Sequence, residues 1–440
     1  MNEFETLSER QRKHVLYTWT AQGSARPVGI QTGQGAEFTD HEGKVWLDFE
    51  SQVFNCNAGH GQTRITDAMV AQAEQLACAH PAAVFERKAA LGEALARVTP
   101  EGIDKFFLCL SGAEAVENAY KIARMVTGRH KVIARRRSYH GASMGALALT
   151  GDWRRMAIEP GVGGVIRMED PYCYRCPYGL SKGKCGTRCA TDLERILELE
   201  GPDTIAAVFL EGVTGANGGF VPPDDYWPII RDICDRHGIL LVSDEVFTGF
   251  GRTGEWFAVD HWSVRPDIIT MAKGLTSGYA PLGAVGITQD IADHFESNTL
   301  WCGLTSYAHP VSCAAALATI EVYEDDRLIE HAAALDSVLK EELQALLAHH
   351  SVVGDVRSIG LLGAMELVTD KTSNTPLVPY GKSAPTGSAI ATFPAELKKR
   401  GLHILVRGHM LIVAPPLCIT EAQLRDGMRR IGDALAAAFN

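Results

Sequence analysis

The sequence predicts an α/β fold, with a large domain on a mainly parallel sheet and a second, smaller α+β domain. Three observations support this prediction. Between residues 105 and 288, short apolar runs typical of buried strands alternate with helical segments. The 440-residue chain is long enough for more than one domain. After a long helix-like stretch at 309–324, the pattern changes to a unit that mixes helices and strands.

The N-terminal residues begin with a helix-like segment and then resemble a hairpin, with strands at 35–40 and 44–49. From about 62 to 98 the pattern is helical and rich in Ala, Leu and Glu. The strands expected in the large domain are 105–110, 131–136, 206–211, 239–243, 267–271 and 282–287. The helices expected between them lie near 112–127, 141–150, 191–200 and 223–237.

The last part of the chain has a different pattern. It predicts helix 327–349, a strand near 360–368, helix 390–400, strands within 402–414 and helix 420–438. We expect the first 60 residues to pack on the same side as this unit. The predicted division is therefore an N-terminal segment at 1–60, a large domain at 61–324 and a small domain at 325–440.

Composition excludes several classes of protein. The chain is 46% hydrophobic and 22% charged, which is ordinary for a soluble globular protein. Its net charge of -11 has no long run of one sign, which argues against nucleic-acid binding. The N-terminus lacks an apolar signal region, and no run of about 18 apolar residues follows. These features predict a cytoplasmic protein without a membrane segment.

Two apolar runs end in residues that suit one cofactor chemistry. The first run, 238–242, is followed by Ser243 and the motif Asp244-Glu245-Val246. The second run, 267–271, is followed by Ala272, Lys273 and Gly274. Ligands gather at the carboxyl ends of parallel strands, where both motifs fall. A lysine can form an imine with an aldehyde cofactor, and a carboxylate can keep a pyridine nitrogen protonated. The alternative is that Asp244 caps a turn and Lys273 is a solvated lysine.

Other motifs follow further strand-like runs. Ser111-Gly112-Ala113 begins a helix, where free N–H groups favour a phosphate, although Ser111 could be only a helix cap. Tyr139-His140 follows the next strand, and Tyr139 could lie on an aromatic cofactor or simply be buried. Glu211 ends another strand. Thr305, before the long helix, is a second possible phosphate donor.

The motifs Ser-Gly-Ala-Glu-Ala, Tyr-His-Gly, Asp-Glu-Val, Ala-Lys-Gly and Thr305 occur in the order seen in class III aminotransferases. The chain resembles this family of pyridoxal-phosphate enzymes over nearly its whole length, and most resembles the ω-amino acid:pyruvate branch. The resemblance implies the pyridoxal-phosphate transferase fold of type I, with a seven-stranded sheet in the large domain. It also implies a homodimer or a dimer of dimers.

The resemblance implies a role for each matching position. Lys273 corresponds to the lysine that forms the imine and moves the proton, and Asp244 to the partner of the pyridine nitrogen. Val246 and Tyr139 would cover the two ring faces, with His140 and Glu211 nearby. The remaining matches would hold the phosphate: Ser111, Gly112 and Ala113 from one subunit and Thr305 from the other.

Departures from the family pattern bear on the substrate. In the ornithine and γ-aminobutyrate branch of the family, a glutamate stands where this chain has Ala216. That glutamate controls the availability of an arginine in the C-terminal domain, and the matching position here is Leu405. The missing pair favours the ω-amino acid:pyruvate branch, in which Phe54 would line the substrate pocket. Arg407 lies two residues beyond Leu405 and, by period-2 alternation, on the same face of a strand. We expect Arg407 to bind the carboxylate of a 2-oxo acid, the alternative being a surface arginine.

Four of the 11 cysteines lie close together in the chain, at positions 173, 176, 185 and 189. Paired thiols at this spacing predict a structural zinc site formed by Cys173, Cys176, Cys185 and Cys189. The alternative is that they pack as free thiols.

The sequence therefore predicts an aminotransferase. It would move an amino group from a primary amine or an ω-amino acid, such as β-alanine or taurine, to a 2-oxo acid such as pyruvate. A racemase or aminomutase would share every motif but would need no second substrate. A non-enzymatic protein with the same fold is disfavoured because Lys273 and Asp244 are both present.

Overall fold

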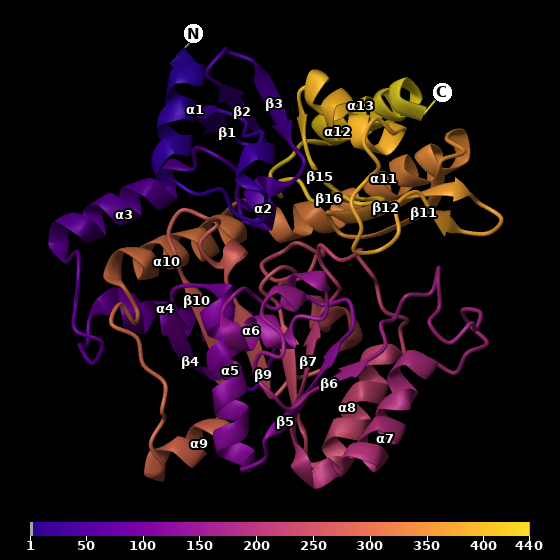
Figure 1. Ribbon diagram of the computed structural model, residues 1–440. Coiled ribbons are helices and arrows are strands. Elements are labelled where there is room, and N and C mark those ends of the chain that lie inside the picture. Colours follow the sequence, from indigo (N-terminus) through magenta and orange to yellow (C-terminus); the bar gives the residue numbers. More distant parts are fainter. Residues whose placement is uncertain (1–2, 440) are drawn as a thin grey trace.

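The large sheet has seven strands in a computed structural model that describes residues 3–439 (Figure 1). Their order is β4-β10-β9-β8-β7-β5-β6. β10 runs antiparallel to both of its neighbours, whereas the other neighbours pair in parallel. The predicted mainly parallel sheet is confirmed. The strands are β4 (Ile103–Cys109), β5 (Lys131–Arg135), β6 (Val165–Met168), β7 (Ile205–Glu211), β8 (Leu240–Asp244), β9 (Ile268–Met271) and β10 (Gly283–Thr288).

The central strands are apolar because helices cover both faces of the sheet. Every residue of β7 is buried. The sequence analysis missed β6, which has only four residues and includes Arg167, so its apolar signal is weak. The helices of this part are α3 (Thr63–Gln75), α4 (Glu86–Val98), α5 (Gly112–Thr127), α6 (Met144–Leu149), α7 (Arg188–Glu200), α8 (Tyr226–His237), α9 (Gln289–Ser297) and α10 (Pro310–Asp325). The continuous helical pattern expected at 62–98 is divided between α3 and α4.

Local sequence accounts for both ends of α5. The Ser111 hydroxyl accepts a hydrogen bond from the Glu114 backbone amide at 3.2 Å. The Glu114 carboxylate in turn accepts one from the Leu110 amide at 2.7 Å. These two side-chain hydrogen bonds to backbone amides cap the N-terminus of α5. At the other end Gly128 has a φ of 67°, which a glycine adopts at little cost.

A sheet near the N-terminus includes a strand from the C-terminal part of the chain (Figure 1). Strands β1 (Ile30–Gln34), β2 (Glu37–Asp40) and β3 (Val45–Asp48) form a sheet with β14 (Leu402–His403), which runs parallel to β3. Two further helices precede the large sheet, α1 (Glu3–His14) and α2 (Ser51–Phe54). The division at residues 60 and 324 remains a prediction, but this pairing supports the expected position of the N-terminal segment.

The C-terminal part carries a separate antiparallel sheet. Its order is β11-β12-β16-β15, and β13 pairs with β12. The strands are β11 (Val353–Ile359), β12 (Leu362–Asp370), β13 (Thr375–Pro376), β15 (Leu405–Arg407) and β16 (Met410–Val413). The helices are α11 (Leu328–His349), α12 (Ala389–Lys399) and α13 (Glu421–Phe439). The sequence analysis did not predict β1, β11 or β13.

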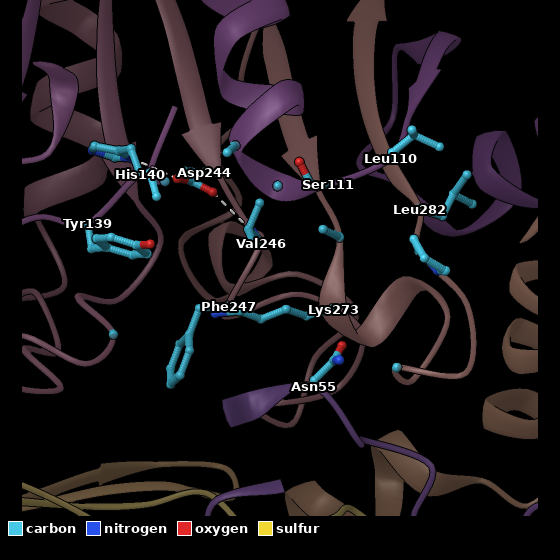
Figure 2. A pocket seen from close by; sticks show the side chains of 18 of the residues that line it. Asn55, Leu110, Ser111, Tyr139, His140, Asp244, Val246, Phe247, Lys273 and Leu282 are labelled. Atoms are coloured by element: carbon cyan, nitrogen blue, oxygen red, sulfur yellow. Dashed lines mark hydrogen bonds and ion pairs between the residues drawn. The ribbon is translucent and has the colours of Figure 1, made fainter. Parts of the chain in front are cut away.

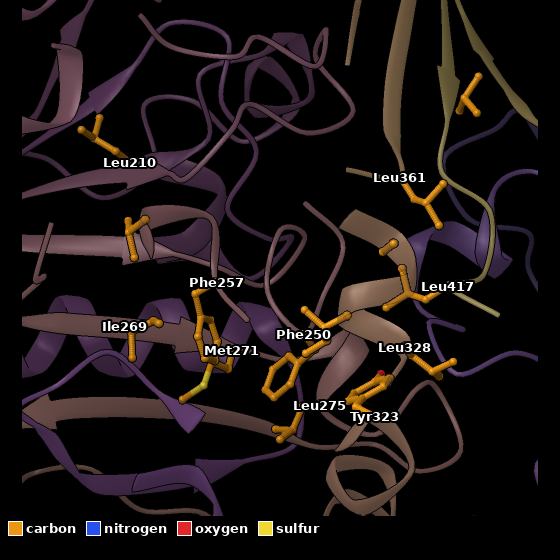
Figure 3. Packing of buried hydrophobic residues seen from close by; sticks show 14 of the residues in the cluster. Leu210, Phe250, Phe257, Ile269, Met271, Leu275, Tyr323, Leu328, Leu361 and Leu417 are labelled. Carbon is orange, nitrogen blue, oxygen red and sulfur yellow. The ribbon is translucent and has the colours of Figure 1, made fainter. Parts of the chain in front are cut away.

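One apolar core joins the large sheet to the C-terminal elements (Figure 3). Phe250 lies in it, 5.2 Å from the Phe257 ring and 6.4 Å from the Tyr323 ring. Leu328 and Leu417 belong to the same cluster and come from the C-terminal part. The site beside the sheet is therefore held by elements distant in sequence. No helix within residues 3–439 is long and apolar enough to cross a membrane.

Candidate active site

A cavity of about 450 Å³ opens at the carboxyl ends of the parallel strands (Figure 2). Such an edge collects residues from separate strands, because parallel strands end on the same side. Nine of the residues singled out in the sequence line this cavity: Ser111, Gly112, Ala113, Tyr139, His140, Glu211, Asp244, Val246 and Lys273. Thr305, Phe54 and Arg407 are not among the lining residues.

Lys273 lies two residues after the end of β9 and extends into the cavity toward Phe247 (Figure 2). Its amine lies 5.0 Å from the centre of the Phe247 ring and 5.6 Å from that of Phe54. Its backbone φ of 46° is in the left-handed region, which costs free energy for a residue with a side chain. Burial lowers the pKa of the Lys273 amine to about 8, against the opposing charges of Asp244 and Glu211. The neutral, nucleophilic form of this amine is thus far more common near pH 7 than it is for an ordinary lysine.

Asp244 is the last residue of β8 and is held by three donors. One oxygen, Oδ2, lies 2.7 Å from Nδ1 of the buried His140. The other, Oδ1, accepts hydrogen bonds from the Thr270 hydroxyl at 3.0 Å and the Val246 amide at 3.1 Å. These contacts fix the carboxylate in orientation. Each carboxylate oxygen can accept more than one hydrogen bond, so Oδ2 retains capacity for a further donor in the cavity.

The start of α5 is suited to an anion. The backbone amides of Gly112 and Ala113 have no hydrogen-bond partner within residues 3–439. They point out of the helix N-terminus, where the dipole also favours negative charge. A Cβ on Gly112 would lie 2.7 Å from a methyl of Val246, so only glycine allows this close approach. The turn brings the helix end and Val246 together at one wall of the cavity.

Glu211, the last residue of β7, orients the wall that carries Tyr139. Its two oxygens accept hydrogen bonds from the amides of Tyr139, at 3.1 Å, and Gly215, at 2.8 Å. Burial raises the pKa of Glu211, with His140 and Arg135 opposing this effect. The carboxylate therefore fixes the backbone on which Tyr139 is presented.

A buried lysine, a fixed carboxylate and a helix N-terminus at one strand edge are typical of enzymes that form an imine with a phosphorylated pyridine aldehyde. The family model for "Aminotransferase class-III" matches residues 20–435. The chain belongs to the class III aminotransferases. The aminotransferase has the fold of type I pyridoxal-phosphate enzymes, as the sequence analysis predicted.

Characterised relatives and solved structures cover nearly the whole aminotransferase. The adenosylmethionine-8-amino-7-oxononanoate aminotransferase of Geobacter sulfurreducens is 33% identical, over 97% of each chain. The taurine–pyruvate aminotransferase of Bilophila wadsworthia is 32% identical, over 94% of this chain and 93% of its own. A taurine:2-oxoglutarate aminotransferase structure from Bifidobacterium kashiwanohense, in complex with PLP and glutamate, has a TM-score of 0.94 at 34% identity, covering 99% of each chain. Two of these relatives are named for taurine and the third is not, so similarity at 32–34% identity does not specify the donor here.

The three remaining site candidates of the aminotransferase lie outside the cavity lining. Phe54 ends the short turn α2, in which all four residues have positive φ, and its ring lies 4.6 Å from that of Phe247. Thr305 is exposed in the segment before α10. Arg407, on β15, lies over the Trp153 ring at 4.3 Å and bonds to the Asp152 carboxylate at 3.1 Å.

The sequence analysis missed several residues at this site. Phe247 and Asn55 line the cavity. Phe247 directly follows the Asp-Glu-Val motif, so its position in the sequence was an available signal. Arg154 lies with its guanidinium carbon 3.6 Å from the centre of the Tyr139 ring, and Asp152 pairs with it. Arg154 lies in a short 3-10 helix at Trp153–Ala157 that Asp152 caps, and this helix is too short to give a periodic signal in the sequence.

The structure does not support the predicted zinc site. Cys173, Cys176, Cys185 and Cys189 do line one small hollow, but no group of three or more His, Cys, Asp or Glu side chains in the described part of the chain is arranged to hold a metal. All four are free cysteines. Spacing along the chain brings thiols near one another, but a tetrahedral site also needs the four sulfurs to converge on one point. The alternative of free packed thiols agrees with the structure.

Proposed function

We propose that this aminotransferase uses pyridoxal phosphate to move an amino group from a primary amine or ω-amino acid to a 2-oxo acid such as pyruvate. The observation that carries the proposal is the placement of Lys273 and Asp244 in one cavity. The amides of Gly112 and Ala113, which have no hydrogen-bond partner among residues 3–439, lie at its wall. An amine, a carboxylate and an anion cradle match the aldehyde, ring nitrogen and phosphate of this cofactor.

Each of these residues has a distinct task in the proposal. The amides of Gly112 and Ala113, with Ser111, bind the phosphate. The carboxylate of Asp244 holds a proton on the ring nitrogen, and His140 keeps that carboxylate in place. The bound cofactor supplies an electron sink for the carbon that loses its proton. Lys273 removes and returns that proton at its amine, which suits a group whose pKa burial lowers to about 8.

We further propose that Phe54 and Arg407 act on the substrate. Phe54 packs edge-on against Phe247, with an interplanar angle of 73°, and together these rings flank the Lys273 amine. Arg407 would bind the carboxylate of the 2-oxo acid, because an acid group beside the cofactor needs a cation. The named taurine aminotransferases make β-alanine and taurine reasonable first donors to test.

The functional assembly in this proposal is a homodimer or a dimer of dimers. Exposed apolar side chains support an interface, including Val84, which is 96% exposed, and Trp301, which is 73% exposed. Thr305 lies in the same segment as Trp301 and would reach the phosphate of the second subunit. Light scattering coupled to size exclusion tests the assembly, and a monomer that turns over substrate would contradict it.

A donor and acceptor screen tests the proposed reaction. The holoenzyme would be incubated with β-alanine, taurine and n-propylamine, each with pyruvate or 2-oxoglutarate, and the new amino acid measured by mass spectrometry. We expect alanine or glutamate to form only when both a donor and an acceptor are present. Conversion of an amino acid without any acceptor would instead indicate a racemase or aminomutase.

A further inference from the structure

Lys273 lies in a strained turn that begins the short 3-10 helix η5 (Lys273–Leu275). Its φ of 46° is in the left-handed region, and so is the φ of 50° at Ser277, four residues later. A residue with a side chain keeps this conformation only where surrounding contacts hold it there. Two of the turn's own hydrogen bonds are long, from the Thr276 amide to the Lys273 carbonyl and from the Ser277 amide to the Gly274 carbonyl, both at 3.2 Å. The position of the Lys273 amine therefore depends on contacts from outside the turn.

Tyr323 supplies such a contact from another helix. It lies near the C-terminal end of α10, and its hydroxyl donates a hydrogen bond to the Gly274 carbonyl at 2.6 Å. This bond is shorter than the one that the same carbonyl accepts from the Ser277 amide. Gly274 directly follows Lys273 in the chain. The hydroxyl of Tyr323 thus acts on the peptide next to the lysine.

The apolar core keeps the Tyr323 ring in place. Tyr323 is fully buried, and Figure 3 shows it in one cluster with Phe250 and Leu275. Its ring centre lies 6.4 Å from that of Phe250 and 6.2 Å from that of Trp256. A buried ring of this size cannot turn away without opening the core, and its buried hydroxyl needs a hydrogen-bond partner. The core therefore directs the hydroxyl to one point.

Close packing holds the other side of the same peptide. A Cβ on Gly274 would lie 2.7 Å from Nδ2 of Asn57 and 2.9 Å from Cβ of Phe250, so only glycine fits here. Asn57 is itself fixed, since its amide nitrogen donates to the Phe250 carbonyl at 3.0 Å. The peptide that follows Lys273 is thus held at its carbonyl by Tyr323 and at its α-carbon by Asn57 and Phe250.

We propose that Tyr323 is a positioning residue, whose hydroxyl holds the turn at Lys273 so that the lysine amine meets its reaction partner in the cavity. Tyr323 is not among the residues that line the cavity, so it acts through the backbone of Gly274 and Lys273. Reactions between bound groups are sensitive to displacements of about 1 Å, which a relaxed turn would produce. The inference rests on the proposed transamination. The alternative is a buried tyrosine whose hydroxyl only satisfies its own hydrogen bond.

Two forms of the cofactor separate these roles without turnover. Pyridoxal phosphate is an aldehyde and can form an imine with Lys273, whereas pyridoxamine phosphate fills the same cavity without one. In equilibrium dialysis of the full-length protein, Tyr323→Phe should bind pyridoxal phosphate roughly 3- to 10-fold more weakly, the factor for one hydrogen bond. It should bind pyridoxamine phosphate as the wild type does. Equal weakening of both forms, or no weakening of either, would overturn the inference.

Tyr279→Phe is the matched control. Tyr279 follows the same turn, and its hydroxyl also donates to a backbone carbonyl, that of Gly59 at 2.9 Å. That carbonyl is not next to Lys273, so Tyr279→Phe should bind both forms of the cofactor as the wild type does. Both variants keep the aromatic ring, and melting temperatures measured with pyridoxamine phosphate bound would show that they are folded. The same selective loss in Tyr279→Phe would contradict a specific role for Tyr323.

Kinetics provides a second readout. With n-propylamine and pyruvate, Tyr323→Phe should lower kcat roughly 3- to 10-fold and leave both KM values unchanged, because the turn moves the amine and not the walls that bind substrate. A loss that appears in KM instead would contradict the positioning role. The two proposals fail separately. If no amine reacts but Tyr323→Phe selectively weakens pyridoxal phosphate binding, only the transamination is refuted. If amines react and Tyr323→Phe keeps wild-type binding and kcat, only the positioning role is refuted.

Discussion

The ionisation of Lys273 offers a direct test of the site. Burial lowers its pKa from 10.5 to about 8. At pH 7 such an amine is neutral in about 9% of molecules, against about 0.03% for an ordinary lysine, a ratio of about 300. Competitive labelling of the cofactor-free protein with acetic anhydride, followed by mass spectrometry, measures this fraction for each lysine. The exposed Lys184 provides the internal reference.

The neighbouring charges give the sign of each variant's effect. Asp244 raises the pKa of Lys273, so Asp244→Asn should move the labelling midpoint to lower pH. Arg154 lowers it, so Arg154→Gln should move the midpoint to higher pH. A wild-type midpoint above pH 10, or an Asp244→Asn midpoint that rises, would refute the assignment of Lys273 to a buried site facing Asp244.

Three other predictions concern the cofactor, the fold and the substrate. The purified protein should be yellow, and borohydride should attach the cofactor to Lys273 alone, as peptide mapping would show. Lys273→Ala should abolish turnover. A label on another lysine would contradict the assignment of Lys273 as the imine-forming residue. Although burial opposes it, the charge of His403, whose Nδ1 lies 3.5 Å from an Asp48 oxygen, and a hydrogen bond with His60 at 2.9 Å hold the pKa of Asp48 below its usual range, while Asp48 raises the pKa of His403. The stability that ionised Asp48 contributes is lost as pH falls below about 3.8, and the stability that charged His403 contributes is lost as pH rises through a value above 6.5. In urea unfolding, Asp48→Asn should therefore lower the free energy of unfolding by about 3 kcal/mol near pH 5.5 and by less at pH 9. Equal losses at the two pH values would argue against this ion pair. Phe54→Ala should improve kcat/KM for bulky amines relative to n-propylamine, and an unchanged ratio would exclude Phe54 from the substrate wall.

Periodicity and motif order were sufficient to predict most of the architecture. Runs such as 206–211 and the Ser-capped helix at 112–127 carry their structure locally, through continuous apolar residues and a reciprocal cap. Because parallel strands end on one side of a sheet, the same runs also predicted that Asp244 and Lys273 would meet. Short elements with polar residues, such as β6 and β11, gave too little signal to predict.

Other features depended on contacts between distant segments. The sequence offered Arg407 as a partner for a substrate carboxylate or as a surface arginine, and it gave no sign of Asp152, 255 positions away, which the fold pairs with Arg407 and with Arg154. The four cysteines have the spacing of a metal site, yet the loop does not arrange them as ligands. Spacing along the chain constrains which groups can approach, but the packing of one segment on another sets their final distances. The sequence alone therefore determined the fold, the family and the cofactor motifs, and the tertiary structure decided which charges lie together beside Tyr139.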